Sequence, residues 1–125
     1  MAIRGALESR LLAWADTKGV PVAWEGVAFN PPANVYLKVF LMPAEPVNMD
    51  LDSGIREYGV FQVSICTPSG TGPQQAEGLA DELRDVFVAD EVIGPVRISK
   101  TPYRSPGLPS DTHYIVPVTI RYSTI

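Results

Sequence analysis

The stretch VYLKVFLM, Val35 to Met42, constrains the fold of this chain more than any other. Its side chains alternate between the two faces of a β-strand, and both faces are largely apolar. One face carries Val35, Leu37, Val39 and Leu41, and the other carries Tyr36, Lys38, Phe40 and Met42. Because helices on one side of a sheet cover only one face, the second apolar face predicts either an internal fold-back or an oligomer interface. We favour the oligomer interface.

Two amphipathic helices are expected to supply the covering layer. Residues Ala2 to Lys18 place apolar side chains at helical spacing, and Gly19 follows as a left-handed stop. A second apolar stripe runs from Ala76 to Phe87 after Pro73, which suits a first helical turn, although Gly78 within it costs about 1 kcal/mol relative to alanine. Both stripes need a sheet face to cover, so we expect an α+β fold. It would be a two-layer sandwich in which a mixed or antiparallel β-sheet carries both α-helices on one face.

Strands and two proline-rich loops complete the expected order. The expected strands are Val20 to Trp24, Val35 to Met42, Ile55 to Cys66, Val96 to Lys100 and His113 to Ser123. Pro43 to Gly54 is expected to be a loop or an irregular hairpin arm, and Tyr103 to Thr112 a loop. Pro21 indicates an edge strand, and Pro117 indicates an edge or a bulge, because proline cannot donate to a strand ladder. The order is helix, three strands, helix, two strands, and we expect a single domain over residues 1–125.

Composition limits the classes of function. The net charge is −4, so the chain has no basic field to gather phosphates, and sequence-specific nucleic-acid binding is not expected. No apolar run approaches the roughly 18 to 20 residues needed to cross a bilayer, so no membrane partner is expected. Cys66 is the only cysteine and cannot form an internal disulfide, which favours a reducing compartment such as the cytosol.

Two loop sequences resemble ligand-binding motifs, and the spacing of each argues against a site. SGTGPQQ, Ser69 to Gln75, precedes a helix as phosphate loops do, but it has no lysine, and Gln75 stands where a dinucleotide loop needs glycine. DLDSG, Asp50 to Gly54, resembles the start of a calcium loop, but Ile55 and Phe61 stand where that loop needs glycine and glutamate. A plain strand-to-helix turn and a solvated acidic loop are favoured, although the acidic loop could recruit a hydrated divalent ion at a subunit boundary.

Cys66 and His113 are the only residues of their types, so a thiol–imidazole pair is the one nucleophilic arrangement that the chain offers. A small buried thiol at a strand end and a surface imidazole beside a loop are commoner roles for such residues. One cysteine and one histidine do not make a zinc site. We therefore expect no enzyme activity, no cofactor and no metal.

Several phrases, taken in order, resemble small phage and prophage proteins related to the lambda-type tail terminators. They are ALESRL, PVAWEGVAFNPP, VYLKVFLMPAEP, REYGVFQVSICTPSGTG, AEGLADELRDVF and YIVPVTIRY. The resemblance spans nearly the whole chain and implies a structural role. It implies subunits that close into a homo-oligomeric ring, six-fold, on the end of the tail tube, where the ring halts polymerisation and offers a surface to head-completion proteins. It also implies location in the bacterial host cytoplasm during assembly and then in the virion tail.

Within that role, the Pro43 to Arg56 segment and the Tyr103 to Thr112 loop are the expected contacts with the ring or the tube, because long loops on a compact domain often carry binding. The charged candidates are Asp50, Asp52, Arg56 and Arg104. Reversal of Arg56 or Arg104 to glutamate should leave the fold intact and abolish tail capping. The alternative is that these are solvated loop charges. Another head–tail joining protein or minor tail protein is the alternative function, and a small-molecule-binding or catalytic α+β domain is a more distant one.

Overall fold

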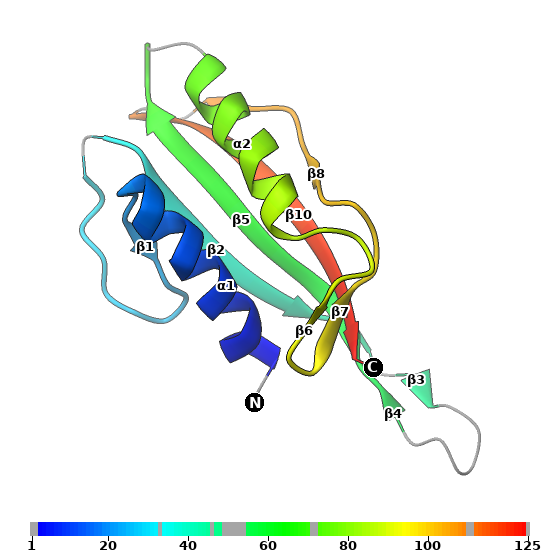
Figure 1. Cartoon of the computed structure of the whole chain (residues 1–125). Helices are drawn as coiled ribbons and strands as arrows, with labels where there is room; N and C mark the ends of the chain where they lie inside the picture. The colour runs from blue at the N-terminus through cyan, green and yellow to red at the C-terminus, as the bar shows by residue number, and fades with distance from the viewer. Residues whose placement is uncertain are drawn as a thin grey trace.

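The computed structural model describes residues 3–32, 34–45, 47–48, 55–70, 73–109 and 112–124. Figure 1 shows two helices lying across the same face of a long twisted sheet, with a small hairpin projecting from one end. The expected α+β architecture, with both helices on one side of the sheet, is confirmed.

Helix α1, Ile3–Lys18, packs on the sheet through side chains that recur at helical spacing. The buried ones are Ala6, Leu7, Leu11 and Ala15. Gly19 follows the helix with φ 67°, a left-handed conformation that glycine adopts without a steric penalty. The predicted helix and its stop are therefore confirmed.

Helix α2, Gln74–Val86, is present as predicted, but Pro73 is its N-cap and not part of its first turn, so the helix begins later than expected. Ala76, Ala80 and Leu83 are buried against the sheet. Phe87 follows the helix and packs on Phe61 of the sheet, with the ring centroids 6.0 Å apart. These contacts fix one side of α2 to the core and leave the other side, including Gly78, exposed to solvent.

The main sheet has eight strands in the order β1-β2-β5-β10-β7-β6, and β8 and β9 also pair with β10. These strands are β1 (Val22–Ala23), β2 (Tyr36–Pro43), β5 (Tyr58–Pro68), β6 (Val92–Ile93), β7 (Val96–Ile98), β8 (Tyr103–Arg104), β9 (Leu108–Pro109) and β10 (His113–Thr124). All neighbours are antiparallel except the parallel pair β1–β2, so the sheet is mixed. The hairpin of β3 (Val47–Asn48) and β4 (Ile55–Arg56) forms a separate two-stranded sheet.

The register of β2, β5 and β10 decides which side chains face the helices. Two rows of three aliphatic side chains run across these strands, and each side chain is at most 1% exposed. The rows are Leu37–Ile65–Val116 and Val39–Val63–Val118. Burial of one such aliphatic side chain stabilises the fold by about 1.5–3 kcal/mol. We call the side of the main sheet that faces α1 and α2 the inner face, and the opposite side the outer face.

The two prolines expected at sheet edges behave differently. Pro21 precedes β1, the outermost strand on its side, as predicted. Pro117 lies instead inside β10, which pairs in continuous register with β5 and also has neighbours on its other side, so the prediction of an edge or a bulge was wrong. The carbonyl of Pro117 accepts a hydrogen bond from the Ser105 amide at 2.9 Å. This bond lies on the side of β10 opposite β5, at the gap between β8 and β9, where Pro117 has no strand partner. The nitrogen of a strand residue faces the same side as its carbonyl, so proline costs no ladder bond to β5.

The strand pattern differs from the expectation at several points, and β1 and β7 are shorter than the predicted strands Val20 to Trp24 and Val96 to Lys100. The predicted loop from Tyr103 to Thr112 contains β8 and β9, which form because β10 offers them unpaired backbone groups. The predicted strand from Ile55 is divided, since Ile55–Arg56 belongs to the hairpin and β5 begins at Tyr58. Strand β6 was not expected. The described part of Pro43 to Gly54 supports the hairpin-arm alternative.

Candidate functional site

No helix among the described elements covers the outer face of the main sheet (Figure 1). Nine large apolar side chains of the described residues are exposed, and six of these lie on the outer face. The six are Phe40, Met42, Tyr58, Val92, Tyr103 and Leu108. The prediction that Phe40 and Met42 point away from the helices is confirmed, and they are 42% and 44% exposed. Single exposed apolar residues are common, but a group on one face indicates a contact surface.

The outer face also carries positive charge. The chain has ten lysine and arginine residues, of which five form ion pairs: Arg4, Arg10, Lys18, Arg84 and Arg104. The other five have no ion pair with any residue that the structure describes: Lys38, Arg56, Arg97, Lys100 and Arg121. Lys38, Arg97 and Arg121 point outward from β2, β7 and β10. None of the described strand residues that point outward is aspartate or glutamate, so the outer face is cationic in a protein of net charge −4.

A groove of about 500 Å³ lies at one end of the outer face. The β3–β4 hairpin leaves the sheet at this end (Figure 1). Arg56, Lys100 and Arg121 line it together with the apolar side chains of Tyr58 and Val60. No carboxylate is among its described lining residues. The groove is therefore suited to an acidic group presented by a partner.

The pKa of the Tyr103 phenol is lowered by two cations that line this groove, Arg121 and Lys100. A hydrogen bond from Arg121 is the main cause that lowers the pKa of the Tyr103 phenol below its ordinary value. A hydrogen bond with Thr119 and the charge of Lys100 act in the same direction. The cations of this face thus favour the ionised form of one of its own side chains.

The other end of the outer face is covered by side chains of the same chain. Tyr36 points outward as expected but is buried, with its ring centroid 5.4 Å from Phe29 and 5.1 Å from His113. Burial is the main cause that raises the pKa of the Tyr36 phenol. Tyr36 is therefore part of an internal fold-back at this end, whereas Phe40 and Met42 remain available for a partner.

The thiol–imidazole pair considered from the sequence lies in the same covered region. Cys66 is opposite Tyr36 in the β2–β5 register and is fully buried. Burial raises the pKa of the Cys66 thiol, which keeps it protonated and therefore a poor nucleophile. His113 is buried and not a surface residue as expected, and its Nδ1 lies 2.9 Å from Thr112 Oγ1. These residues contribute packing to the outer layer of the sheet.

The charged contact candidates do not form one cluster. Asp50 and Asp52 lie outside the described residues. Arg56 is exposed in β4 and lines the groove on the outer face. Arg104 lies on the inner side of β8, and its guanidinium is 3.4 Å from Glu77 Oε2 and 3.7 Å from Asp81 Oδ1 of α2. Arg56 is thus available to a partner, whereas Arg104 is already engaged with α2.

Metal and anion sites gain no support from the part of the chain that is described. Among those residues, no group of three or more histidine, cysteine, aspartate or glutamate side chains could hold a metal ion. Asp50 to Gly54, and Thr71 with Gly72 of the phosphate-loop sequence, lie outside the described residues. Neither described helix is long and apolar enough to span a bilayer.

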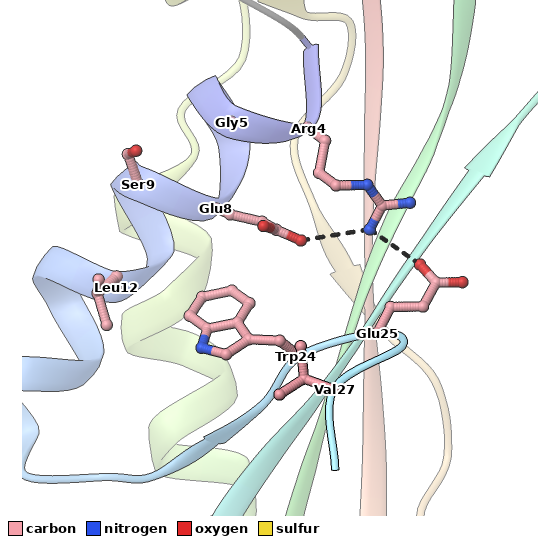
Figure 2. Close-up of a pocket in the computed structure, with 8 residues that line it drawn as sticks. All are labelled: Arg4, Gly5, Glu8, Ser9, Leu12, Trp24, Glu25 and Val27. Carbon is pink, nitrogen blue, oxygen red and sulfur yellow. Dashed lines mark hydrogen bonds and ion pairs between the residues drawn. The ribbon is translucent and has the colours of Figure 1, made fainter. Parts of the chain in front are cut away.

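A second hollow lies between α1 and the segment after β1 (Figure 2). Its walls are Arg4, Gly5, Glu8, Ser9, Leu12, Trp24, Glu25 and Val27. Arg4 Nη1 donates to Glu25 Oε1 at 3.0 Å and to Glu8 Oε2 at 3.3 Å. The Leu41 amide also donates to Glu25 Oε1, at 3.0 Å, and this bond is the main cause of the lowered pKa of the Glu25 carboxyl. These polar groups bind one another, so their main role is to hold the segment after β1 against α1.

The cations of the outer face were not identified from the sequence. Lys38, Arg97 and Arg121 are isolated basic residues in three separate strands. The alternation of β2 does place Lys38 beside Phe40 on one face, which is a usable local signal. The shared face of all three follows only from the register between strands, which the sequence pattern does not give.

Comparisons with known proteins agree with this geometry. None of the curated proteins compared is similar to the chain. One solved structure, whose title states no function, is 35% identical, covers 98% of this chain and 93% of its own, and has a TM-score of 0.82. A chain from a structure titled as the virion of a native gene transfer agent particle is 20% identical, covers 98% of this chain and 94% of its own, and has a TM-score of 0.70, so it shares the fold. Residues 2–122 match the family described as phage tail terminator protein. The chain therefore belongs to the phage tail terminator family and is a structural protein of the phage tail.

Proposed function

We propose that this protein caps the tail tube as an oligomeric ring, stops tail polymerisation and provides the surface on which the head is joined. The family match over residues 2–122 is the observation that carries the proposal. The uncovered outer face, with six exposed large apolar side chains, supports a subunit that is completed by neighbours. In this proposal the whole chain acts as one domain in a hexameric ring. Its partners are further copies, the tail tube protein and a head-completion protein.

No catalytic step is needed for this role, and we propose that the protein is not an enzyme and uses no cofactor. The family is structural, and the buried Cys66 thiol with its raised pKa is unsuited to nucleophilic chemistry. Assembly would take place in the bacterial host cytoplasm, and the protein would then remain in the virion tail. Its binding is directed at proteins, with no sequence-specific recognition of nucleic acid.

The charged residues on the two loop segments are proposed to make ring or tube contacts. Arg56, which lines the outer groove, is the best placed of them, and Asp50 and Asp52 lie on the same segment of the sequence. Arg56→Glu is expected to leave the fold intact and abolish capping. Arg104→Glu needs a matched control, because it also places a carboxylate against Glu77 and Asp81. Arg104→Gln removes the positive charge without that repulsion. Loss of capping in Arg104→Gln would support a contact through Arg104, whereas normal capping would contradict it.

The test of the function is electron microscopy of phage particles that lack this protein. Overlong tails without heads are expected, because nothing would stop tube growth. Tails of normal length without heads would instead identify another head–tail joining or minor tail protein and would overturn the capping role. Negative-stain images of purified protein mixed with tail tubes should show a ring at one tube end. Tubes whose ends and lengths are unchanged by the protein would contradict the proposal.

A further inference from the structure

The cationic charge of the outer face restricts the kind of partner that it can bind. Two copies that met outer face to outer face would oppose Lys38, Arg97 and Arg121 with the same cations. Such juxtaposed like charges are unfavourable, so a two-fold dimer through this face is disfavoured. The six exposed apolar side chains of this face favour a protein partner over a bare phosphate backbone. The partner surface should therefore be a protein surface with negative charge.

Helix α2 presents such a surface on the opposite side of the molecule (Figure 1). It carries four carboxylates and one arginine: Glu77, Asp81, Glu82, Asp85 and Arg84. The Asp81 and Glu82 side chains are 61% and 47% exposed although each has an ion pair, Asp81 with Arg84 and Arg104 and Glu82 with Lys18. Asp85 is exposed and has no ion pair with any other residue in the described ranges. The outward edge of α2 is therefore acidic.

Gly78 gives an independent indication that something approaches this side of α2. It is exposed in the middle of the helix, and a Cβ atom built on it would meet nothing within 4 Å. Packing within the subunit therefore does not require glycine, which weakens a helix interior relative to alanine. A glycine on a helix surface does allow the side chains or backbone of another molecule to approach closely.

We propose that the outer face of one copy docks on the acidic side of helix α2 in the next copy, with Gly78 at the contact. This proposal rests on the proposed ring function and identifies which two surfaces meet. Because the two surfaces lie on opposite sides of the subunit, every copy uses both, and the contact is head-to-tail. Head-to-tail contacts close into rings when the rotation between subunits allows it, whereas they cannot form a two-fold dimer.

Two charge-reversal variants test the pairing. The outer-face variant carries Arg97→Glu and Arg121→Glu, and the helix variant carries Glu82→Lys and Asp85→Lys. Each variant alone opposes like charges, so self-association should fall by about tenfold or more. In an equimolar mixture every contact can again join opposite charges, because the reversed outer face meets the reversed helix and the native outer face meets the native helix. The mixture should therefore recover association that neither variant shows alone.

Association is measured by sedimentation velocity in solution and by chemical cross-linking on tail tubes, with circular dichroism as the check that each variant is folded. The proposal is overturned if the folded variants associate like the wild type, or if their mixture fails to recover. It is also overturned if the wild type shows no self-association in either setting. Capping by the wild type is scored separately on the same tubes. Capping that persists with both variants contradicts only this contact, whereas tubes left uncapped by the wild type contradict the proposed function.

Gly78→Gln tests the helix side without a change of charge. It should raise the melting temperature by about 2–4 °C, because glutamine is the better helix former, and should reduce association by about tenfold. Gly78→Ala is the matched control, with at least as much stabilisation, because alanine is the best helix former, and a smaller loss of association. Association of Gly78→Gln equal to that of the wild type would exclude α2 from the contact. Binding of a DNA duplex that depends on Arg121, with association unchanged in both charge variants, would make the outer face a nucleic-acid surface and overturn the proposal.

Discussion

Gly59 of β5 lies between Pro43 of β2 and Tyr122 of β10, and alanine at this position should destabilise the protein for steric reasons. A Cβ atom there would lie 2.6 Å from Met42 O, 2.7 Å from Tyr122 Oη and 2.9 Å from Pro43 Cα. Atoms in ordinary contact are about 3.5–4.0 Å apart, so the neighbours would have to move by roughly half an ångström or more. Two of the three are backbone atoms of a strand paired with Gly59, and Tyr122 is only 2% exposed, so none can simply turn into solvent.

The size of the effect follows from two opposing terms. Overpacking of a well-packed site costs about 1–3 kcal/mol. The lower conformational entropy of the unfolded alanine chain offsets about 0.4–1 kcal/mol of this. The net loss in the free energy of unfolding is expected to be about 1–2 kcal/mol. In a chain of this length that loss lowers the melting temperature by about 4–8 °C.

Gly78→Ala is the matched control, because it is the same chemical change in a helix where the added methyl group meets nothing. It should raise the free energy of unfolding by about 0.5–1 kcal/mol. Urea denaturation of both variants, followed by circular dichroism at low protein concentration, measures the two changes with opposite signs. A Gly59→Ala variant as stable as the wild type would refute the steric reasoning.

Three further predictions concern single side chains. Arg104→Gln should lower the free energy of unfolding by only about 0.5 kcal/mol, because both ion pairs of Arg104 are exposed to solvent. Denaturant titrations should show this difference shrinking at high salt, and a loss several times larger would be inconsistent with solvent-screened pairs. Cys66 should react with iodoacetamide far more slowly in the native protein than in urea, as followed by mass spectrometry, because burial raises the pKa of the thiol, and rapid native labelling would contradict its burial. Arg121→Gln should raise the pKa of the Tyr103 phenol toward its ordinary value in an NMR pH titration, since the hydrogen bond from Arg121 is the main cause that lowers it, and an unchanged titration would remove that cause.

The helices and long strands were predictable because their signals are local. The alternation in β2 and the helical stripes of α1 and α2 each lie within one stretch of sequence. Strands β8 and β9 were missed for the opposite reason. Each is only two residues long in a proline-rich segment, and its pairing depends on the backbone of β10, which the local sequence does not contain.

The interaction surface was predictable only in part for the same reason. Phe40 and Met42 follow from alternation within β2, whereas the cover over Tyr36 depends on Phe29, which returns from an earlier segment. Arg104 was selected because it was expected in a loop. It lies instead opposite Val118 on the inner face, where the register directs it toward α2. Such outcomes depend on which strands are neighbours, and a one-residue change of register would have reversed them.

The margins of the main sheet limit how this protein can polymerise. On one side β1 pairs only with Leu37 and Lys38 of β2, and further along β2 the Leu41 amide donates to Glu25 Oε1. On the other side the margin consists of β6, β8 and β9, and each of these three strands, like β1, is two residues long in the described chain. A long unpaired strand at a margin would recruit further chains by backbone pairing, in an open-ended stack. Short margins beside prolines, and a β2 margin whose Leu41 amide is already bonded to Glu25, give such a stack a poor template. The proposed ring would therefore join its copies mainly through side chains, and a subunit whose family is described as tail terminators is itself poorly suited to seed a fibril.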